Sequence, residues 1–540
     1  MNVSGGRRSA LILQVRLLAF GALLAVATIL GGCGGDGDKN GDGRGTGDGS
    51  GGDIRRGGTL VVGISSNPIY FDPMLQNDAP GGTISSQIFE GLYKYDENLK
   101  PQPWLAETID ISQTGLEYVF HLRKGVKFHD GTEMDAEAVK FSVDRVRNNP
   151  KSIGYADGRT ISDTAAVDKY TFKITLSEPF APFPSRLTGR LGAVVSPAAA
   201  RTMGDEKFNE NPVGTGPFKF VQFRSDSHVR LARFENYWRQ ASDGKPLPYL
   251  DGVEFRVITE AANRLTALQA GDIHTTSLRE ADIPIAKKDT NIVIDQGPGF
   301  GWGGIWLTID KPPFNNKALR QAVAYAIDRD AINKAIYEGQ RTIANGPIPP
   351  VLSWAVDPNF KPYPHDLGKA RQLLAEGGRP NGFEFEYWIS AGDSTGQQLA
   401  ELIQAQLAKV EIKVKIEAAD FNGVVIPKLQ KGESNAYQLG LTGGVDPDQH
   451  VAGAFAKGGS FNFFPYENAR VDELIRQGRR VTSIEERAQI YKEAVRAIME
   501  DAPYIFTVYG IDRYVGLKKV KGWYIGVKAT TGYSEFWLSE

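Results

Sequence analysis

The sequence predicts an α/β fold in which strands and helices alternate along the chain. Strand patterns with a period of two and helix patterns with a period near 3.6 alternate along the chain, and one strand–helix–strand unit at 383–416 is almost complete. Hydrophobic residues make up 41% and charged residues 23% of the 540 residues, and such globular proportions exclude a mostly disordered chain. Because domains contain roughly 100–200 residues, this length predicts two to four compact lobes.

The first 32 residues are expected to be an export signal. Three arginines precede an apolar run at 17–30, which is short for a membrane-spanning helix and typical of a secretory signal peptide. The run ends in Leu30-Gly31-Gly32-Cys33, which resembles the bacterial lipobox. That resemblance implies a diacylated Cys33 as the first residue of the mature protein and the chain's lipid anchor. A twin-arginine signal at Arg7-Arg8 is the alternative export route.

A glycine-rich segment follows this cysteine. Residues 34–52 include 10 glycines among 19 residues, and such a segment cannot bury enough apolar surface to offset its ordering entropy. We expect a disordered tether over 33–56, which would hold a globular body near a membrane face outside the cytoplasm. The folded part should begin near Gly57 or Gly58. No later run resembles a transmembrane helix.

Short strands and one helix are expected in the first part of the folded chain. The earliest strand is apolar throughout, whereas the later ones alternate apolar and polar residues. His129-Asp130-Gly131 supplies a turn before the helix. The expected elements are strands at 59–64, 118–122, 126–128 and 172–176 and a helix at about 135–147.

The clearest unit lies at 383–416. Residues 383–389 alternate as a strand, apolar residues at 399–410 follow at helical spacing, and 412–416 alternate again. The crossover of such a unit is right-handed and its strands should be parallel. Because open parallel sheets hold ligands beyond the carboxyl ends of their strands, this topology predicts site residues in two loops. These are Ser390–Asp393 and Thr442–Gly444, the latter after an expected strand at 437–441.

One further helix is expected after residue 315. Asn315 or Asn316 can cap it, and Leu319, Val323 and Ile327 form one apolar stripe along it. A glycine at position 339 is its expected end.

The sequence contains none of the common catalytic motifs. GxxxxGK[ST], GxSxG and HExxH are absent. Gly299, Gly301 and Gly304 match GxGxxG, but residues 305–309 read as a strand where a dinucleotide site needs a helix. We interpret these glycines as a joint between lobes. We expect no catalytic residue, no cofactor and no metal, because the only cysteine belongs to the anchor and the histidines are dispersed. The histidines are His121, His129, His228, His274, His365 and His450.

The charge balance excludes a further class of function. Lys+Arg 62 against Asp+Glu 64 gives a net charge of −2, whereas nucleic-acid binding needs clustered positive charge. We therefore expect no nucleic-acid partner.

A collinear series of motifs runs along nearly the whole mature chain, and the longest of them is the stretch 118–131. The motifs are Gly57–Leu60, Phe71–Pro73, Ile88–Leu92, Pro103–Glu107, Tyr118–Gly131, Asn211–Phe218, Leu268–Asp272, Pro313–Asn316 and Leu319–Val323. In content and in order they resemble the motifs of the family 5 extracellular solute-binding proteins of ABC importers, which include oligopeptide-, dipeptide- and nickel-binding proteins. We expect the residues of these motifs to build scaffold, with Gly125 and Gly131 in turns.

The resemblance implies a periplasmic-binding-protein-like α/β fold with two lobes joined by crossing strands. By analogy, lobe I combines 57–93, 206–298 and 506–540, with an inserted subdomain at 94–205, and lobe II is 299–505. A solute would sit in the cleft between the lobes and be enclosed by hinge closure, a two-state shift that requires tighter binding to the closed form. A membrane permease of the ABC type would then recognise the closed form.

In peptide-binding relatives, an aspartate in a Gly-Trp-x-x-Asp segment holds the peptide's α-amino group. The corresponding stretch here is 440–447, where Gly443 or Gly444 stands at the aspartate position and Leu441 replaces the tryptophan. A buried ammonium without a paired carboxylate is costly, so another carboxylate should replace it. The alternatives are Asp446, Asp393 and Asp78, and Asp446 is also suited to a turn or cap before Pro447.

Three tryptophans are the aromatic candidates. Trp302 and Trp306 lie near the expected lobe junction and Trp388 ends a strand. Trp302 is the favoured pocket residue, whereas Trp306 and Trp388 are suited either to a pocket or to a core. Aromatic faces suit an apolar side chain or a sugar ring, so an oligosaccharide is the alternative ligand to a peptide, and a chelated metal is a third. The candidate ligand-binding residues are Asn77, Asp78, Trp302, Trp306, Trp388, Ser390, Asp393, Thr442, Gly443, Gly444 and Asp446.

The expected function is therefore solute capture without catalysis. The chain would be a monomeric lipoprotein of an ABC importer, on the outer face or periplasmic side of the cell membrane, that delivers a peptide-like solute to a permease. The alternative class is a surface-anchored hydrolase or adhesin. A sensor in place of a permease is a third possibility.

Overall fold

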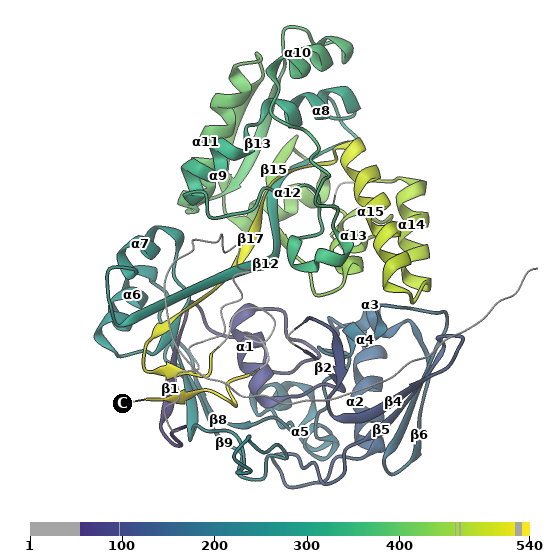
Figure 1. Cartoon of the computed structure of the whole chain (residues 1–540), viewed down its shortest axis with the longest axis vertical. Helices are drawn as coiled ribbons and strands as arrows, with labels where there is room; N and C mark the ends of the chain where they lie inside the picture. The colour runs from purple at the N-terminus through teal and green to yellow at the C-terminus, as the bar shows by residue number, and fades with distance from the viewer. Residues whose placement is uncertain (1–53, 97, 460, 464–465, 524–531, 540) are drawn as a thin grey trace, which may run out of the picture. The chain divides into compact units, whose positions relative to one another are not determined.

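The protein is described by a computed structural model that covers residues 54–96, 98–459, 461–463, 466–523 and 532–539 (Figure 1). The predicted signal peptide, Cys33 and most of the predicted tether lie outside these residues. Arg56, the last residue of the expected tether, pairs with Asp243 at 3.1 Å, and the first strand begins at Thr59. None of the helices in the described ranges is both long enough and apolar enough for a membrane span.

An eleven-stranded mixed sheet runs through the described chain in the order β14-β13-β15-β12-β17-β11-β1-β10-β9-β8, with β16 paired to β12 outside this path. β1 is parallel to β10 and β11, and β13 is parallel to β14 and β15, whereas the remaining pairs are antiparallel. The strands are β1 (Thr59–Ile64), β8 (Phe218–Arg224), β9 (His228–Arg233), β10 (Gly252–Val257), β11 (Thr275–Thr276), β12 (Ile292–Leu307), β13 (Glu384–Ser390), β14 (Lys413–Ala419), β15 (Ala436–Gln438), β16 (Leu441–Thr442) and β17 (Tyr504–Leu517).

β12 and β17 form one long antiparallel ladder in the middle of this sheet. Figure 1 shows the two strands side by side, and their pairing runs from Ile292 opposite Leu517 to Trp306 opposite Tyr504. The register shifts on either side of Trp302. The strands of the N-terminal half join the β17 side and β13–β15 join the β12 side, so the chain passes between the two halves of the sheet through this ladder.

A second, smaller sheet lies within the segment expected to be an insertion. Its order is β4-β5-β7-β6, with every pair antiparallel. The helix α2 (Ala136–Arg147) packs against it, and Asp135 caps that helix by accepting a hydrogen bond from the Ala138 N–H at 2.9 Å. The strands are β4 (Ala106–Ile111), β5 (Glu117–Leu122), β6 (Ile161–Asp168) and β7 (Thr171–Leu176); β2 (Tyr93–Tyr95) pairs with β3 (Pro101–Pro103), and β18 (Val520–Lys521) with β19 (Trp537–Leu538).

Helices of the N-terminal half and of the C-terminal half cover separate parts of the sheet. Those of the first half are α1 (Ala79–Ile88), α3 (Tyr155–Gly158), α4 (Phe183–Arg186), α5 (Pro197–Glu210), α6 (Ala261–Ala270) and α7 (Ile283–Ala286). Those of the second half are α8 (Lys317–Ala326), α9 (Arg329–Tyr337), α10 (Leu367–Glu376), α11 (Ser394–Ala408), α12 (Ile426–Lys431), α13 (Pro447–Phe455), α14 (Ala469–Arg480) and α15 (Ile484–Asp501).

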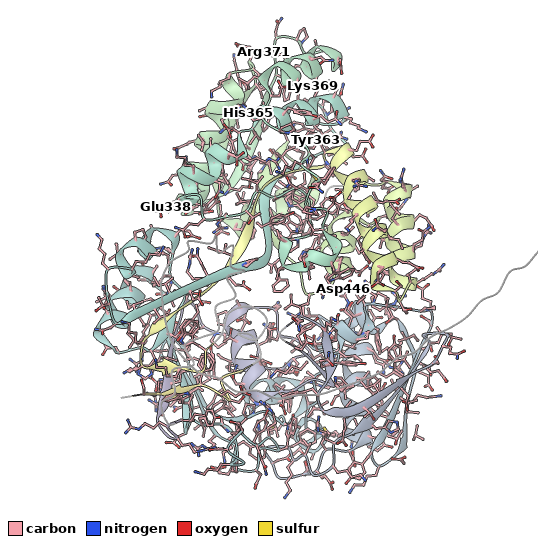
Figure 2. All side chains as sticks on the ribbon, viewed as in Figure 1. Glu338, Tyr363, His365, Lys369, Arg371 and Asp446 are labelled. Carbon is pink, nitrogen blue, oxygen red and sulfur yellow. The ribbon has the colours of Figure 1, made fainter. Side chains whose placement is uncertain are left out.

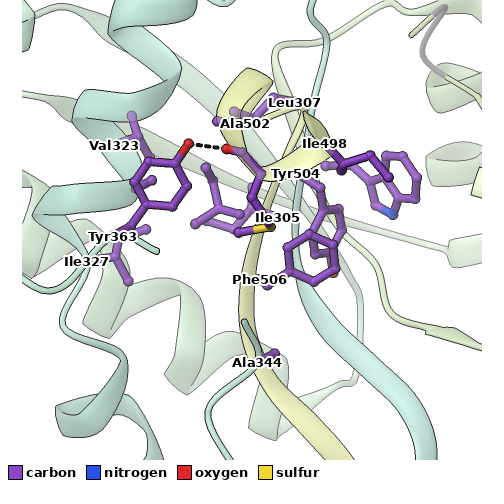
Figure 3. Packing of buried hydrophobic residues seen from close by; sticks show 14 of the residues in the cluster. Ile305, Leu307, Val323, Ile327, Ala344, Tyr363, Ile498, Ala502, Tyr504 and Phe506 are labelled. Carbon is purple, nitrogen blue, oxygen red and sulfur yellow. Dashed lines mark hydrogen bonds between the residues drawn. The ribbon is translucent and has the colours of Figure 1, made fainter. Parts of the chain in front are cut away.

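The buried apolar side chains form separate cores. The largest lies within 302–509, a second lies almost wholly within 92–194, and a third combines residues of 60–89, 193–255 and 520–536. Figure 3 shows Ile305 and Leu307 of β12 packed with Tyr504 and Phe506 of β17 in the largest core. These cores support the proposed division into lobe II, the inserted subdomain and lobe I, which we keep as a proposal.

Three of the sequence motifs meet at one buried carboxylate. Glu90 accepts hydrogen bonds from the indole N–H groups of Trp104 at 2.8 Å and Trp238 at 2.9 Å, and from the hydroxyls of Thr215 at 3.1 Å and Tyr237 at 2.7 Å. Glu90, Trp104 and Thr215 belong to three different matched segments. A buried carboxylate needs such donors, so the motif residues are held in place by each other.

Most sequence-predicted elements are confirmed. The strands at 59–64, 118–122 and 172–176, the helix capped by Asp135 and the parallel strand–helix–strand unit are all present. Gly125 and Gly131 have φ of 76° and 85°, as their turns require. The GxGxxG glycines lie inside β12 and no helix follows them directly, which confirms that they are no dinucleotide motif.

Three expectations were wrong. Residues 126–128 form no strand, because the Gly131 N–H bonds to the Phe128 carbonyl at 2.9 Å and closes a turn. The helix expected to run toward Gly339 is two helices, broken where Gln406 bonds both the N–H and the carbonyl of Asp328. The strand expected at 437–441 is split into β15 and β16, with Gly440 tight against the Trp302 carbonyl.

Candidate functional site

The predicted loop Ser390–Asp393 lies at the carboxyl end of β13, which contacts the end of β15 through Gln438, whereas the predicted loop Thr442–Gly444 begins in β16. The Tyr387 hydroxyl bonds to the Gln438 Oε1 at 3.1 Å, and a Cβ on Gly396 would lie 2.5 Å from the Gln438 amide nitrogen. Asp393 caps α11 by accepting from the Gly396 N–H at 2.9 Å. The structure thus brings the Ser390–Asp393 loop next to the end of β15.

The second loop continues onto the crossing ladder. Thr442 pairs with Gly301, and the Gly443 N–H donates to the Phe300 carbonyl at 3.4 Å. Thr442 is exposed, whereas Gly443 and Gly444 are half-buried. The loop that the sequence singled out therefore rests directly on the joint between the two halves of the sheet.

The two glycines of this loop leave room for α13. A Cβ on Gly443 would lie 2.5 Å from the His450 ring, and one on Gly444 would lie 2.1 Å from the Gln449 side chain. His450 is buried, and its Nε2 bonds the Gly444 carbonyl at 2.7 Å. Burial lowers the pKa of His450 to about 4, so the ring is neutral and donates from Nε2. An aspartate side chain at position 443 has no space here.

Asp446, which is labelled in Figure 2, is occupied by bonds within the C-terminal half. It caps α13 in a capping box with Gln449, and both its oxygens accept from the Arg487 guanidinium, at 2.8 and 2.9 Å. The interpretation of Asp446 as a cap is confirmed. Its carboxylate is only 5% exposed, which leaves little surface for a ligand.

Asp448, which the sequence reasoning missed, is the most buried carboxylate of this region. It is 0% exposed and accepts from Arg479 of α14 at 2.6 Å and from Arg186 of α4 at 3.0 Å. The Tyr491 hydroxyl lies 3.4 Å away. An Asp-Pro-Asp run at a helix start hinted at two carboxylates of different roles, but no sequence signal indicated the distant arginines.

Trp302 and Trp306 are buried in an aromatic cluster. They are 3% and 1% exposed, and both pack against Tyr504 with ring centroids 4.8 and 5.0 Å apart. Phe455 stacks on both rings. The Trp302 indole N–H has no hydrogen-bond partner among the described residues. Their burial supports a packing role for both rings.

Trp388 lies on the opposite face of β13 from Tyr387. It is half-buried, its indole N–H bonds Glu386 at 3.2 Å, and the Lys428 ammonium lies 4.9 Å from its ring centroid. Ser390, two residues on, shares that face and is also half-buried.

Asn77 and Asp78 belong to the N-terminal half. Asn77 is exposed, and Asp78 caps α1 by accepting from the Gly81 N–H at 2.7 Å. Among the described residues, no hydrogen bond or ion pair joins either residue to the loops of the C-terminal half, so the structure does not bring this pair together with the other candidates.

The crossing ladder carries a carboxylate that sequence reasoning also missed. Asp512 of β17 stands opposite Gly297 and is half-buried without a hydrogen bond or ion pair among the described residues. Burial raises its pKa above the usual value. The next residue, Arg513, bonds Gln296 at 3.2 Å and Glu280 at 3.0 Å.

The described residues hold no group of three or more histidine, cysteine, aspartate or glutamate side chains that could bind a metal. One small hollow of about 20 Å³ is lined by Asn345, Gly346, Phe360 and Tyr509, and another of about 400 Å³ lies against α14 and α15; neither is lined by the candidate residues.

Comparisons with known proteins give one consistent answer. The sequence profile of the bacterial extracellular solute-binding proteins, family 5, matches residues 100–463. The glutathione-binding protein GsiB of Pectobacterium atrosepticum is 33% identical over 478 residues, which cover 86% of this chain and 91% of that protein.

Two solved structures are similar over most of the chain. The periplasmic binding protein DppA of Helicobacter pylori, in complex with the peptide STSA, is 31% identical with a TM-score of 0.77, over 90% of this chain and 99% of that one. NikZ of Campylobacter jejuni, in complex with Ni(L-His), is 27% identical with a TM-score of 0.75, over 86% and 95%. The names and titles of these three proteins point to different solutes.

Proposed function

Because the chain belongs to the bacterial extracellular solute-binding proteins of family 5, we propose that it captures a peptide-like solute and delivers it to the permease of an ABC importer. Members of this family bind solutes for transport and are not enzymes. The observation that carries the proposal is the match over residues 100–463 combined with the β12–β17 ladder, because the family relationship and a two-strand connection together support hinged capture.

The ladder is the proposed hinge. Two adjacent strands that connect two cored halves can change angle with few altered dihedrals, and the glycines of β12 and the register shifts beside Trp302 lower the resistance to bending there. A solute that contacts both halves would then bind the closed form better than the open one.

We propose that the solute contacts the loops at the ends of β13 and β15. Ser390, Asp393, Thr442, Gly443 and Gly444 offer hydroxyl, carboxylate and backbone groups at the edge of the sheet where parallel strands end. Asn77 and Asp78 are the proposed contacts from lobe I. A peptide has both charged and amide groups to match such a surface.

The solute class rests on the relatives. GsiB is named for glutathione and DppA was solved with a peptide, which supports a peptide-like solute here. A chelated metal is the second candidate, because NikZ was solved with Ni(L-His), in which histidine supplies ligands that the described residues of this chain lack. Anchoring through Cys33 is a further proposal, supported by the sequence at 30–33.

Differential scanning fluorimetry with a solute panel tests the proposal. Tri-alanine, a mixed dipeptide set and glutathione should raise the melting temperature of the full chain, since a solute at 100 times its Kd stabilises by about 2.7 kcal/mol. Maltotriose and Ni²⁺ with free histidine are the comparison arms. Stabilisation only by maltotriose or by the nickel complex would reject the peptide class, and steady turnover of chromogenic ester, peptide or glycoside substrates would reject a binding protein.

A further inference from the structure

We infer that Asp448 and Arg186 form a clasp that holds the inserted subdomain against lobe II and stabilises the closed form even without solute. The inference rests on the proposed function for its meaning, because closure is the step by which such a protein would retain its solute. We define the clasp as Asp448, Arg186, Arg479 and the backbone bond between Ala181 and Arg479.

The two sides of the clasp come from segments far apart in the chain. Arg186 ends α4, in the proposed insertion, and its Nη2 lies 3.0 Å from Asp448 Oδ2 in α13 of proposed lobe II. The Ala181 N–H donates to the Arg479 carbonyl at 2.6 Å, a second bond between the same two regions. Both contacts would be broken by opening.

Burial makes this contact different from a surface ion pair. The Asp448 side chain is 0% exposed and that of Arg186 is 12% exposed, so water screens their attraction weakly. Two guanidinium groups share the one carboxylate, since Arg479 also binds Asp448 at 2.6 and 3.2 Å. Arg186 in turn lies 3.3 Å from Asp157, so the cluster stays balanced in charge.

Asp448 keeps an arginine partner whether the interface is formed or separated, because Arg186 and Arg479 lie on opposite sides of that interface. When the subdomain moves away, Arg479 remains on α14 next to α13 and still neutralises Asp448, whereas Arg186 leaves with α4. Asp448 therefore never becomes a buried unpaired charge, which would cost several kcal/mol. Phe180 adds to the contact: the guanidinium groups of Arg186 and Arg479 lie 5.8 and 5.6 Å from its ring centroid, one from each side of the interface.

A second ion pair across the same interface provides a matched control. Arg480 and Glu178 lie 3.2 Å apart, but their side chains are 61% and 63% exposed. Such exposed pairs contribute at most about 1 kcal/mol and often nothing measurable. Removing the exposed pair and removing the clasp therefore separate a general loss of charge from loss of the buried contact.

Hydrogen exchange and solution scattering of the full chain, with no solute added, test the clasp. In the wild type, the Ala181 amide should exchange slowly and the scattering profile should match that calculated from the present structure, in which the clasp is formed. Arg186→Met should speed exchange of the Ala181 amide by at least about tenfold and increase the radius of gyration, because a loss of about 1.4 kcal/mol shifts the equilibrium tenfold. Arg480→Met should change neither.

Asp448→Asn is the second variant, in case Arg186→Met folds poorly, and it should have the same effects. Fast Ala181 exchange in the solute-free wild type, or identical exchange and scattering in wild type and Arg186→Met, would overturn the inference. Because these readouts need no solute, they are independent of the solute panel: a panel without any stabilising member would reject the proposed function and leave the exchange result to decide the clasp.

Discussion

At the scale of single residues, the described chain separates glycines that the packing requires from glycines that it does not. Gly443 faces the His450 ring at a distance that excludes a Cβ, whereas nothing lies within 4 Å of the Cβ position of Gly189. Gly443→Ala should therefore lower the unfolding free energy by about 1–3 kcal/mol, the usual cost of overpacking, and Gly189→Ala should cost far less. Urea denaturation of both variants checks this. Equal losses of unfolding free energy in the two variants would show that α13 shifts to make room for the added Cβ without destabilising the fold.

Asp512 offers the opposite case, a residue whose replacement should stabilise. Its folded pKa is raised above 3.8, so the charged carboxylate destabilises the fold at neutral pH and this effect disappears as the pH falls below both pKa values. Asp512→Asn should raise the melting temperature at pH 7, because it removes the partly buried charge. Asp163→Asn, on the exposed face of β6, is the control and should have no effect. A lower melting temperature for Asp512→Asn would mean that the carboxylate has a structural partner.

At the scale of elements, Glu90 joins three segments whose motifs lie far apart in the sequence. Glu90→Gln keeps the shape but replaces one acceptor oxygen by an NH2 group, which would face two of the four N–H and O–H donors. The unfolding free energy of the Glu90→Gln variant should be lower by about 2–4 kcal/mol, because buried donors lose their acceptor. Glu117→Gln, on an exposed position of β5, serves as the control in thermal unfolding followed by circular dichroism. Equal thermal stability of Glu90→Gln and Glu117→Gln would show that Glu90 does not hold the three segments together.

The same elements show which structural features could be predicted from the sequence and which could not. Periodicity located the strands and the parallel unit at 384–419 because apolar spacing follows directly from which face is buried. It missed the break between α8 and α9, since that break depends on Gln406, a side chain about 80 residues away that bonds Asp328. Topology predicted that the loop at Asp393 follows a parallel strand, but the partners of Asp446 and Asp448 are long-range contacts without local pattern.

At the scale of the whole molecule, buried histidines make stability depend on pH. Burial lowers the pKa of His129, His274 and His450 to about 4 each, compared with 6.5 when exposed. Below pH 6.5 the unfolded chain therefore binds protons that the folded chain does not bind. The stability due to these neutral rings is complete above pH 6.5 and is lost progressively as the pH falls to about 4.

The unfolding free energy of the full chain should therefore fall steeply between pH 6.5 and pH 4, and His450 alone should contribute about 2 kcal/mol of that loss by pH 5. His450→Gln replaces the ring by an uncharged side chain of similar hydrogen-bonding capacity. It should reduce the slope of the unfolding free energy against pH, even if it lowers stability at pH 7. His121→Gln removes an exposed ring paired with Asp110 and should leave the slope nearly unchanged. Urea titrations at half-unit pH steps measure these slopes. If the unfolding free energy of the wild type and that of His450→Gln depend equally on pH, His450 is protonated in the folded chain. Its Nε2 bond to Gly444 would then not fix a neutral ring against the Gly443–Gly444 loop.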